Sequence, residues 1–275
     1  MSEFQKYFFG LFFLLLPFSI VSGPFLPDLT FVIFSIYFLI NYKFIIIFFS
    51  KYKFLYIIIL FWLIISFESF FSDYFYHSFS SSLVYVRFLI GSLGISVFLI
   101  KNNEFLKYFA YSFFLCFVVL IVDGFYQYYF KVNLIGMSTD NPQRVSSFFG
   151  NELILGSFLS RLMPLLFFFI FYFKKIFVFN IYSGLVLLFF IDVLTFYTGE
   201  RVAFGYITLA TILMIILLEK YKIYRLITFL FSILFITVLV FTSENLKNRM
   251  IDQTVHGMGL TKEPVTDIFT MTDSN

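Results

Sequence analysis

The chain has 275 residues, of which 61% are hydrophobic, 25% are aromatic and only 13% are charged. This composition excludes an ordinary soluble domain and predicts an all-α membrane protein. The formal net charge of +3 says little by itself, because in membrane proteins the placement of the charges carries the information.

The sequence also excludes several kinds of functional site. Cys116 is the only cysteine, so there is neither a disulfide framework nor a thiolate metal site. No phosphate-binding glycine loop, metal-spaced histidine cluster or basic nucleic-acid patch occurs. We therefore expect no cofactor, no metal ion and no nucleic-acid partner.

A series of apolar runs along the chain is long enough for bilayer-crossing helices, each of which needs about 20 residues. The sequence predicts a polytopic bundle of about nine transmembrane helices within residues 1–241. Lys43 interrupts the second run, so that helix either ends early or carries a snorkelling lysine. The runs cover residues 7–22, 28–48, 54–71, 83–100, 105–123, 152–173, 176–197, 202–218 and 224–241.

Basic residues recur on alternate links between these runs, which sets the orientation. The positive-inside rule places these links and the N-terminus in the cytoplasm, and the links at 23–27, 72–82, 124–151 and 198–201 on the outer face. Residues 242–275 are polar and lie outside, either as a short tail or as the start of a large periplasmic loop within which the chain ends. The inner links carry Lys6; Lys43, Lys51 and Lys53; Lys101 and Lys107; Lys174 and Lys175; and Lys220, Lys222 and Arg225.

Arginine is concentrated on the predicted outer side and within the spans, whereas lysine fills the inner links. A charge in the hydrocarbon costs on the order of 3 kcal/mol on insertion scales, so such residues are candidate functional groups. Arg161 lies deepest, in the sixth run and shortly before Pro164. The charges near the predicted outer boundary are Arg87, Asp123, Arg144, Glu152, Asp192, Glu200 and Arg201.

Two interpretations of these arginines are open. They are either rim charges whose ion pairs hold helices in register, or a positive, partly dehydrated site for an anion. A lipid-linked diphosphate suits the second interpretation, because arginine forks bind phosphate through charge-assisted hydrogen bonds. Phospholipid headgroups and a transported anion are rival ligands, although a transporter would more usually place its charges at the midplane.

The segment 123–166, DGFYQYYFKVNLIGMSTDNPQRVSSFFGNELILGSFLSRLMPLL, resembles the O-antigen ligase and polymerase superfamily of bacterial envelope enzymes. In that family an Asp and a Tyr-Gln pair close one span, and an outer loop carries an Arg followed by small residues, Phe and Gly. The next span ends in a Leu-Ser-x-x-x-Pro-like turn. TGERVAF at 198–204 resembles the later Ser/Thr-Gly-x-Arg motif, and NRMIDQTVHGMGL at 248–260 resembles the start of the family's large outer loop.

The resemblance implies a metal-independent transferase on the periplasmic face of the bacterial inner membrane. Such enzymes move a glycan from undecaprenyl diphosphate to a lipid A core, a growing polysaccharide or a protein side chain. We therefore predict Arg201 and Glu200 as catalytic residues, and Arg144, Arg201, Arg87 and Arg161 as ligands of the lipid diphosphate. Glu200 would orient Arg201 or a sugar hydroxyl, or else pair structurally with a neighbouring helix.

One family element is missing. A His-Asn pair later in the outer loop normally supplies the residue thought to activate the acceptor, and the chain ends at Asn275 without it. His256 comes too early in the loop to be this catalytic base, and His77 is a weaker candidate for the same role. We expect a truncated transferase that lacks its general base. The alternative is a multi-span transporter or flippase for an anionic lipid-linked glycan.

Overall fold

A computed structural model describes residues 3–41, 43, 49–53, 55–139, 141, 144–173, 181–242, 247, 250 and 255. Within these residues the regular structure is helical, apart from an isolated bridge between Val132 and Ser138. The all-α prediction is confirmed. The predicted periplasmic segment 242–275, including His256, lies almost wholly outside the described residues.

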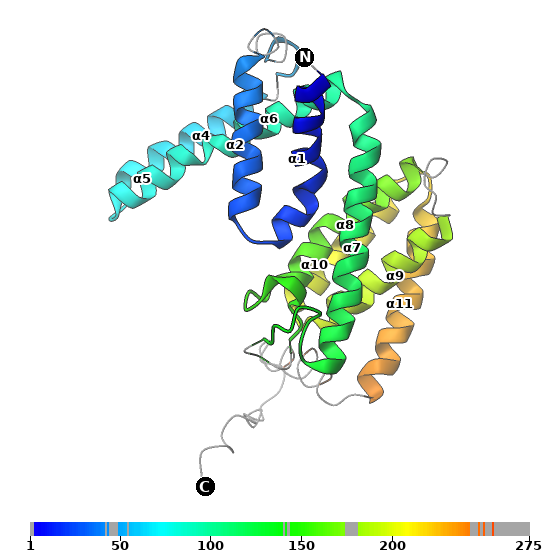
Figure 1. Cartoon of the computed structure of the whole chain (residues 1–275). Coiled ribbons are helices and arrows are strands. Elements are labelled where there is room, and N and C mark those ends of the chain that lie inside the picture. Colours follow the sequence, from blue (N-terminus) through cyan, green and yellow to red (C-terminus); the bar gives the residue numbers. More distant parts are fainter. Residues whose placement is uncertain are drawn as a thin grey trace. The chain divides into compact units, whose positions relative to one another are not determined.

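The chain divides into two compact units, Met1–Phe113 and Phe114–Asn275, and α7 runs from the first into the second (Figure 1). The N-terminal unit holds α1 (Glu3–Val21), α2 (Phe25–Ile40), α4 (Leu55–Glu68), the short 3-10 helix η1 (Ser69–Phe71), α5 (Phe75–Val84), α6 (Val86–Lys101) and the start of α7 (Glu104–Phe130). The C-terminal unit holds the rest of α7, the 3-10 helix η2 (Ser147–Phe149), α8 (Leu155–Tyr172), α9 (Ile181–Tyr197), α10 (Arg201–Leu217) and α11 (Lys222–Thr242).

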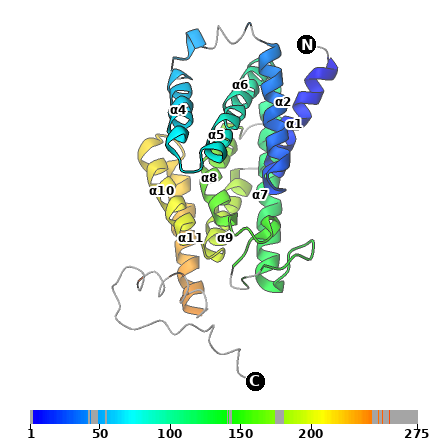
Figure 2. The same ribbon diagram turned by 90° about the vertical axis from the view of Figure 1, so that its left-hand side faces the viewer.

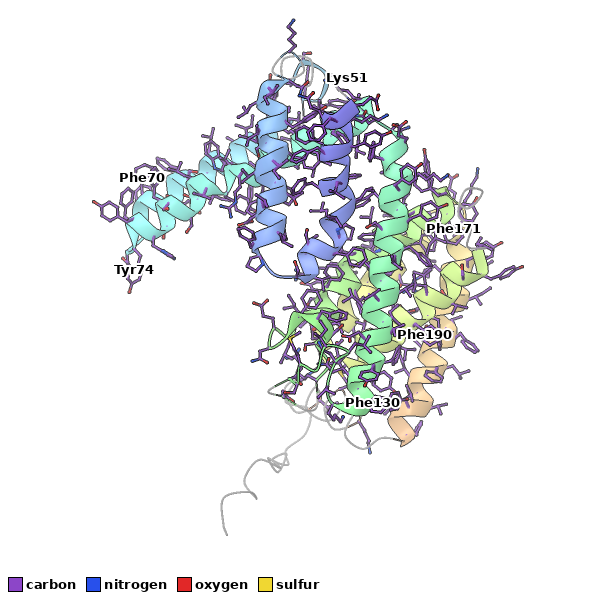
Figure 3. All side chains as sticks on the ribbon, in the orientation of Figure 1. Lys51, Phe70, Tyr74, Phe130, Phe171 and Phe190 are labelled. Carbon is purple, nitrogen blue, oxygen red and sulfur yellow. The ribbon has the colours of Figure 1, made fainter. Side chains whose placement is uncertain are left out.

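Five helical stretches of the described chain are long and apolar enough to cross a membrane. Shorter apolar helices accompany them, namely α2, α4 with η1, α9 and α10. Many apolar side chains face outward, as for Phe70, Tyr74 and Phe130, which are 54%, 78% and 64% exposed (Figure 3). These features are those of a membrane protein. The long stretches are α1, α5 with α6, α7, α8 and α11.

Two predicted links are partly helical. Most of the predicted link 72–82 belongs to α5, and α7 continues to Phe130 rather than ending at Asp123. The sequence predicts a helix that ends at the charged residue Asp123. Asp123 is instead fully buried on α7, and the aromatic residues that follow it continue the helix. In contrast, α2 ends at Ile40 as the interruption by Lys43 suggests.

In the N-terminal unit, small residues let α2 and α6 pack closely. A Cβ on Gly91 would lie 2.6 Å from the carbonyl oxygen of Phe31, and one on Gly94 would overlap the carbonyl of Phe34. Small residues allow the same backbone approach between helices in many membrane proteins. Ser35 adds a hydrogen bond across this contact, because its hydroxyl donates to the carbonyl of Arg87 at 3.0 Å.

In the C-terminal unit, α8 packs against α9 and α10, and α11 packs against the same two helices (Figure 2). α7 joins this group where Gly124 faces Leu194 of α9 and Leu155 of α8. Gly199 turns the chain between α9 and α10 at φ +70°, a conformation that glycine adopts without strain. This turn and the described part of the loop between α7 and α8 lie at the same end of the bundle, which we call the Glu200 end.

Candidate anion-binding site

Arg144 lies in the loop between α7 and α8 and is aimed by backbone carbonyls. Its Nε donates to the carbonyl of Thr198 at 3.4 Å, and its Nη2 donates to the carbonyl of Leu153 at 3.1 Å. Nη2 also lies 3.8 Å from Glu200 Oε1, and the Arg144 side chain is 19% exposed. Nη1 makes no hydrogen bond within the described residues, so this guanidinium is fixed in place with donors left over.

Glu200 caps the first turn of α8 from the turn before α10. Its Oε1 accepts the backbone N–H of Gly156 at 2.9 Å, while Oε2 accepts the N–H of Ser157 at 3.1 Å and its hydroxyl at 2.7 Å. These amides are among those that a helix N-terminus leaves without intrahelical partners, and a carboxylate there also complements the helix dipole. Glu200 therefore stabilises α8, which favours the structural interpretation of this residue.

The end of α7 holds the loop that carries Arg144. Gln127 Oε1 accepts the backbone N–H groups of Ser146 and Ser147 at 2.9 and 2.6 Å. Asp123 accepts the Ser147 hydroxyl at 2.5 Å and the N–H of Leu134 at 2.7 Å. Ser147 has φ +53°, a strained conformation for a residue other than glycine, so these four bonds fix a loop geometry that would otherwise relax.

Arg161 and Arg201 belong to the faces of α8 and α10. Both side chains are exposed, and the Arg161 guanidinium lies over the ring of Tyr206 at 5.5 Å from its centroid. Arg201 is the first residue of α10, directly after Glu200. The Glu200 end thus carries Arg144, Arg201 and, further along α8, Arg161, with Glu200 as the acid in contact with Arg144.

Arg87, the remaining predicted diphosphate ligand, belongs to the N-terminal unit. Its Nη2 donates to Asp28 Oδ2 at 2.6 Å, and the two side chains are 32% and 37% exposed. Its guanidinium also stacks on Phe88, at 4.8 Å from the ring centroid. These contacts fit the interpretation of Arg87 as one half of a rim ion pair with Asp28.

Asp192 and Arg225 form a separate, fully buried pair. Two parallel hydrogen bonds of 2.8 Å join the guanidinium to the carboxylate, while Thr211 accepts from Arg225 and Ser232 donates to Asp192 at 3.0 Å. The prediction that Arg225 lies in an inner link is wrong, because it lies within α11 at 0% exposure. Asp192 lies five residues before the end of α9, and Arg225 binds it inside the bundle.

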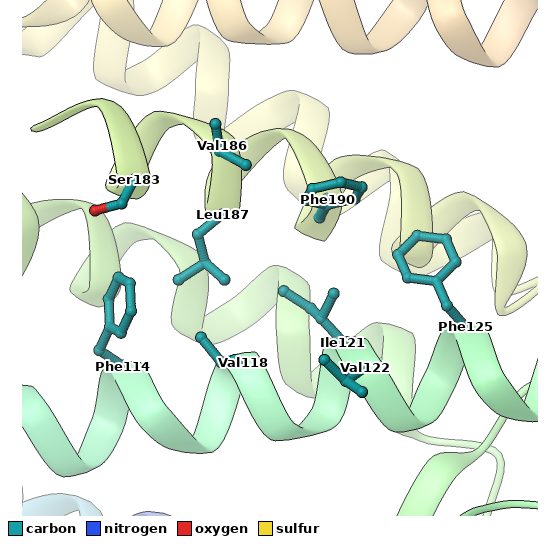
Figure 4. A pocket seen from close by; sticks show the side chains of 9 residues that line it. All are labelled: Phe114, Val118, Ile121, Val122, Phe125, Ser183, Val186, Leu187 and Phe190. Atoms are coloured by element: carbon teal, nitrogen blue, oxygen red, sulfur yellow. The ribbon is translucent and has the colours of Figure 1, made fainter. Parts of the chain in front are cut away.

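An apolar groove of about 690 Å³ runs between α7 and α9 (Figure 4). Ser183 is its one polar lining side chain, and the predicted arginines do not line it. The residues on the α7 side are Phe114, Val118, Ile121, Val122 and Phe125, and those on the α9 side are Ser183, Val186, Leu187 and Phe190. Such a lining suits hydrocarbon and offers no group for chemistry.

Sequence reasoning missed most of the groups that hold these charges. Gln127 was noted only as part of the Tyr-Gln pair of the family resemblance, and Ser157 is an ordinary polar residue in the sequence. Nothing near them in the chain shows that they meet a loop amide or Glu200. The pairing of Asp192 with Arg225 had a usable signal, since these opposite charges lie in two apolar runs, the seventh and the ninth. His77 is exposed on α5. Among the described residues, no group of three or more His, Cys, Asp or Glu could hold a metal ion.

Comparison with protein-family models, with curated proteins and with solved structures finds no match for this chain.

Proposed function

We propose that the chain binds the diphosphate of a lipid-linked glycan at the Glu200 end and takes part in transferring that glycan to an acceptor. The proposed donor is an undecaprenyl diphosphate-linked glycan, and the proposed acceptor is a lipid A core or a growing polysaccharide. The reaction would take place on the periplasmic face of the bacterial inner membrane, with about nine membrane crossings. The motif resemblance and the arginines at the Glu200 end support this function.

The observation that carries the proposal is the setting of Arg144. Its hydrogen bonds within the described residues go to neutral carbonyls, and both oxygens of the nearby Glu200 are bound to the amides of α8. Its charge is therefore only partly compensated, although the side chain is largely buried. A phosphate would supply the missing charge through bidentate hydrogen bonds. A fixed guanidinium also suits the negative charge that develops as a diphosphate leaves.

Within this proposal the predicted residues take different parts. Arg144 and Arg201 bind the diphosphate and stabilise the leaving group, and Glu200 is a positioning residue for α8 and Arg144. The part of Arg161 in binding the glycan donor stays a prediction. The part of Arg87 in binding the glycan donor stays a prediction, since Asp28 already binds its guanidinium. The residue that activates the acceptor remains to be supplied from outside the described residues.

The test uses purified protein with a lipid-linked glycan and an acceptor. Arg144→Ala should weaken binding of the glycan donor and Arg201→Lys should abolish most transfer, because a lost charge-assisted hydrogen bond of about 1.5–3 kcal/mol corresponds to roughly 10- to 100-fold in rate. Lys131→Ala is the matched control, since it removes an exposed cation at the end of α7. Normal transfer by both arginine variants at normal expression would show that these residues are rim anchors.

A second candidate function is transport or flipping of an anionic lipid-linked glycan. The buried Asp192–Arg225 pair favours it, because charges inside a bundle often line ion or substrate pathways. Movement of the lipid across vesicles that contain the protein, with no glycosidic or phosphate bond broken, would support transport. Release of undecaprenyl diphosphate that requires both protein and acceptor would support transfer.

A further inference from the structure

Arg161 is an unpaired cation on an otherwise apolar helix face. The side chain is exposed, and within the described residues its guanidinium makes no hydrogen bond and no ion pair, only the contact with the Tyr206 ring. Further along the same face of α8 are Leu165 and Phe168, which are 39% and 50% exposed. Five N–H donors are thus presented on a surface suited to lipid.

The neighbouring face of α10 has the same character. Tyr206 is 43% exposed and lies between Val202 and Leu209, which are 67% and 53% exposed. Gly205 is also exposed, and a Cβ built on it would meet no atom within 4 Å. The seam between Arg161 on α8 and Tyr206 on α10 is therefore open at its surface. We call it the Arg161 seam.

The position of Arg161 along the helix lets its guanidinium reach the level of a lipid headgroup. α8 has 18 residues, or about 27 Å at 1.5 Å per residue, which is close to the thickness of the hydrocarbon core. Arg161 lies about 9 Å along α8 from Leu155. Side chains of a helix lean toward its N-terminus, so Arg161 and Tyr206 both lean toward the Glu200 end. An arginine so placed can snorkel to the interface.

The chemistry of the seam selects an anion attached to a lipid. An uncompensated charge at this depth is costly, and an anionic partner lowers that cost. The planar fork of arginine matches phosphate, while the Tyr206 ring holds the guanidinium by a cation–π contact. The apolar side chains around the seam suit the hydrocarbon chains of the same molecule.

We infer that the Arg161 seam binds the phosphate of a membrane lipid that approaches from the bilayer between α8 and α10. The lipid is either an anionic phospholipid or the lipid-linked glycan donor, and both present the same phosphate chemistry. The inference shares Arg161 with the proposed function but does not depend on transfer, because binding a phospholipid requires no glycan.

The experiment measures lipid binding to the purified full chain in nanodiscs of phosphatidylcholine. Phosphatidylglycerol and undecaprenyl diphosphate are titrated separately, and bound lipid is counted by native mass spectrometry. Arg161→Gln should weaken binding of at least one of them about tenfold or more, which corresponds to the loss of a charge-assisted contact. Tyr206→Leu should weaken it about threefold or more through loss of the cation–π contact, and Tyr206→Phe should retain it.

The control is Lys131→Gln, which removes another cation that lies over a tyrosine, at 5.0 Å from the Tyr128 ring centroid. An effect confined to phosphatidylglycerol supports a phospholipid site, and one confined to undecaprenyl diphosphate assigns the seam to the glycan donor. Equal binding of both lipids by wild type and Arg161→Gln overturns the inference. Arg144→Ala separates the two proposals, because it should impair transfer while leaving binding of phosphatidylglycerol unchanged.

Discussion

At the scale of single residues, Glu200 shows how a candidate catalytic group can be a structural cap. Its two oxygens accept three hydrogen bonds from the first turn of α8, and its Oε1 lies 3.8 Å from Nη2 of Arg144. A residue that acted as a general acid or base would need an oxygen available to the substrate. A capping role and an acid–base role for Glu200 therefore predict different effects of substitution at this residue.

We predict that Glu200→Ala lowers the free energy of unfolding by roughly 1–3 kcal/mol, because it leaves amides of α8 without partners. Glu200→Gln should destabilise less, since one oxygen acceptor remains. Thermal unfolding in detergent measures both effects. Glu152→Ala is the matched control, because Glu152 is an exposed acid in the loop before α8. Wild-type stability of Glu200→Ala, together with complete loss of transfer, would favour catalysis over capping.

The local features of the site could be predicted from the sequence, but the contacts between residues far apart in the chain could not. The turn at Gly199 and the outward position of Arg201 follow from local patterns, namely a glycine and charges between two apolar runs. Glu200 meets Gly156 across 44 residues of sequence, and Arg225 meets Asp192 across 33. No local spacing encodes these contacts, because they depend on how whole helices pack.

At the scale of helices, the Asp192–Arg225 pair joins α9, α10 and α11. Each charge alone would be costly to place in hydrocarbon, and together they form a saturated network with Thr211 and Ser232. Removing one partner leaves the other buried and uncompensated. The pair therefore makes the packing of these helices mutually dependent.

We predict that Asp192→Ala lowers the free energy of unfolding by about 3–5 kcal/mol, whereas the double variant Asp192→Leu with Arg225→Met is less destabilised than Asp192→Ala. A double-mutant cycle on unfolding in detergent provides the measurement. Asp28→Asn serves as the comparison, because its pair with Arg87 is partly exposed and should contribute less than about 1 kcal/mol. Equal small effects for both pairs would contradict a special role for the buried one.

The helices themselves were the most predictable feature, since every predicted apolar run contains a helix over most of the part that the structure describes. The boundaries were less predictable. α7 passes Asp123 because Leu134 and Ser147 hydrogen-bond this carboxylate inside the fold. A charge in an apolar run marks a helix end only when it has no such partners.

At the scale of the whole molecule, the decisive property is how many helices cross the membrane. Five stretches of the described chain are long and apolar enough, and α9 and α10, with 17 residues each, reach about 25 Å at 1.5 Å per residue. That length is somewhat below the hydrocarbon thickness of about 30 Å. Short helices can cross through local thinning of the bilayer and snorkelling of flanking residues.

We predict that α8, α9 and α10 each cross the membrane, and single cysteines test this. Cys116 is the only cysteine and is buried, so Cys116→Ala provides the background. Glu152→Cys and Val202→Cys should react with an impermeant maleimide in intact cells, because they precede α8 and begin α10 at the Glu200 end. Lys175→Cys and Lys220→Cys should react only after permeabilisation, which also serves as the control for reactivity. Labelling of Val202→Cys and Lys220→Cys from the same side would mean that α10 does not cross, whereas labelling of Val202→Cys only after permeabilisation would place Arg201 away from the face proposed for glycan transfer.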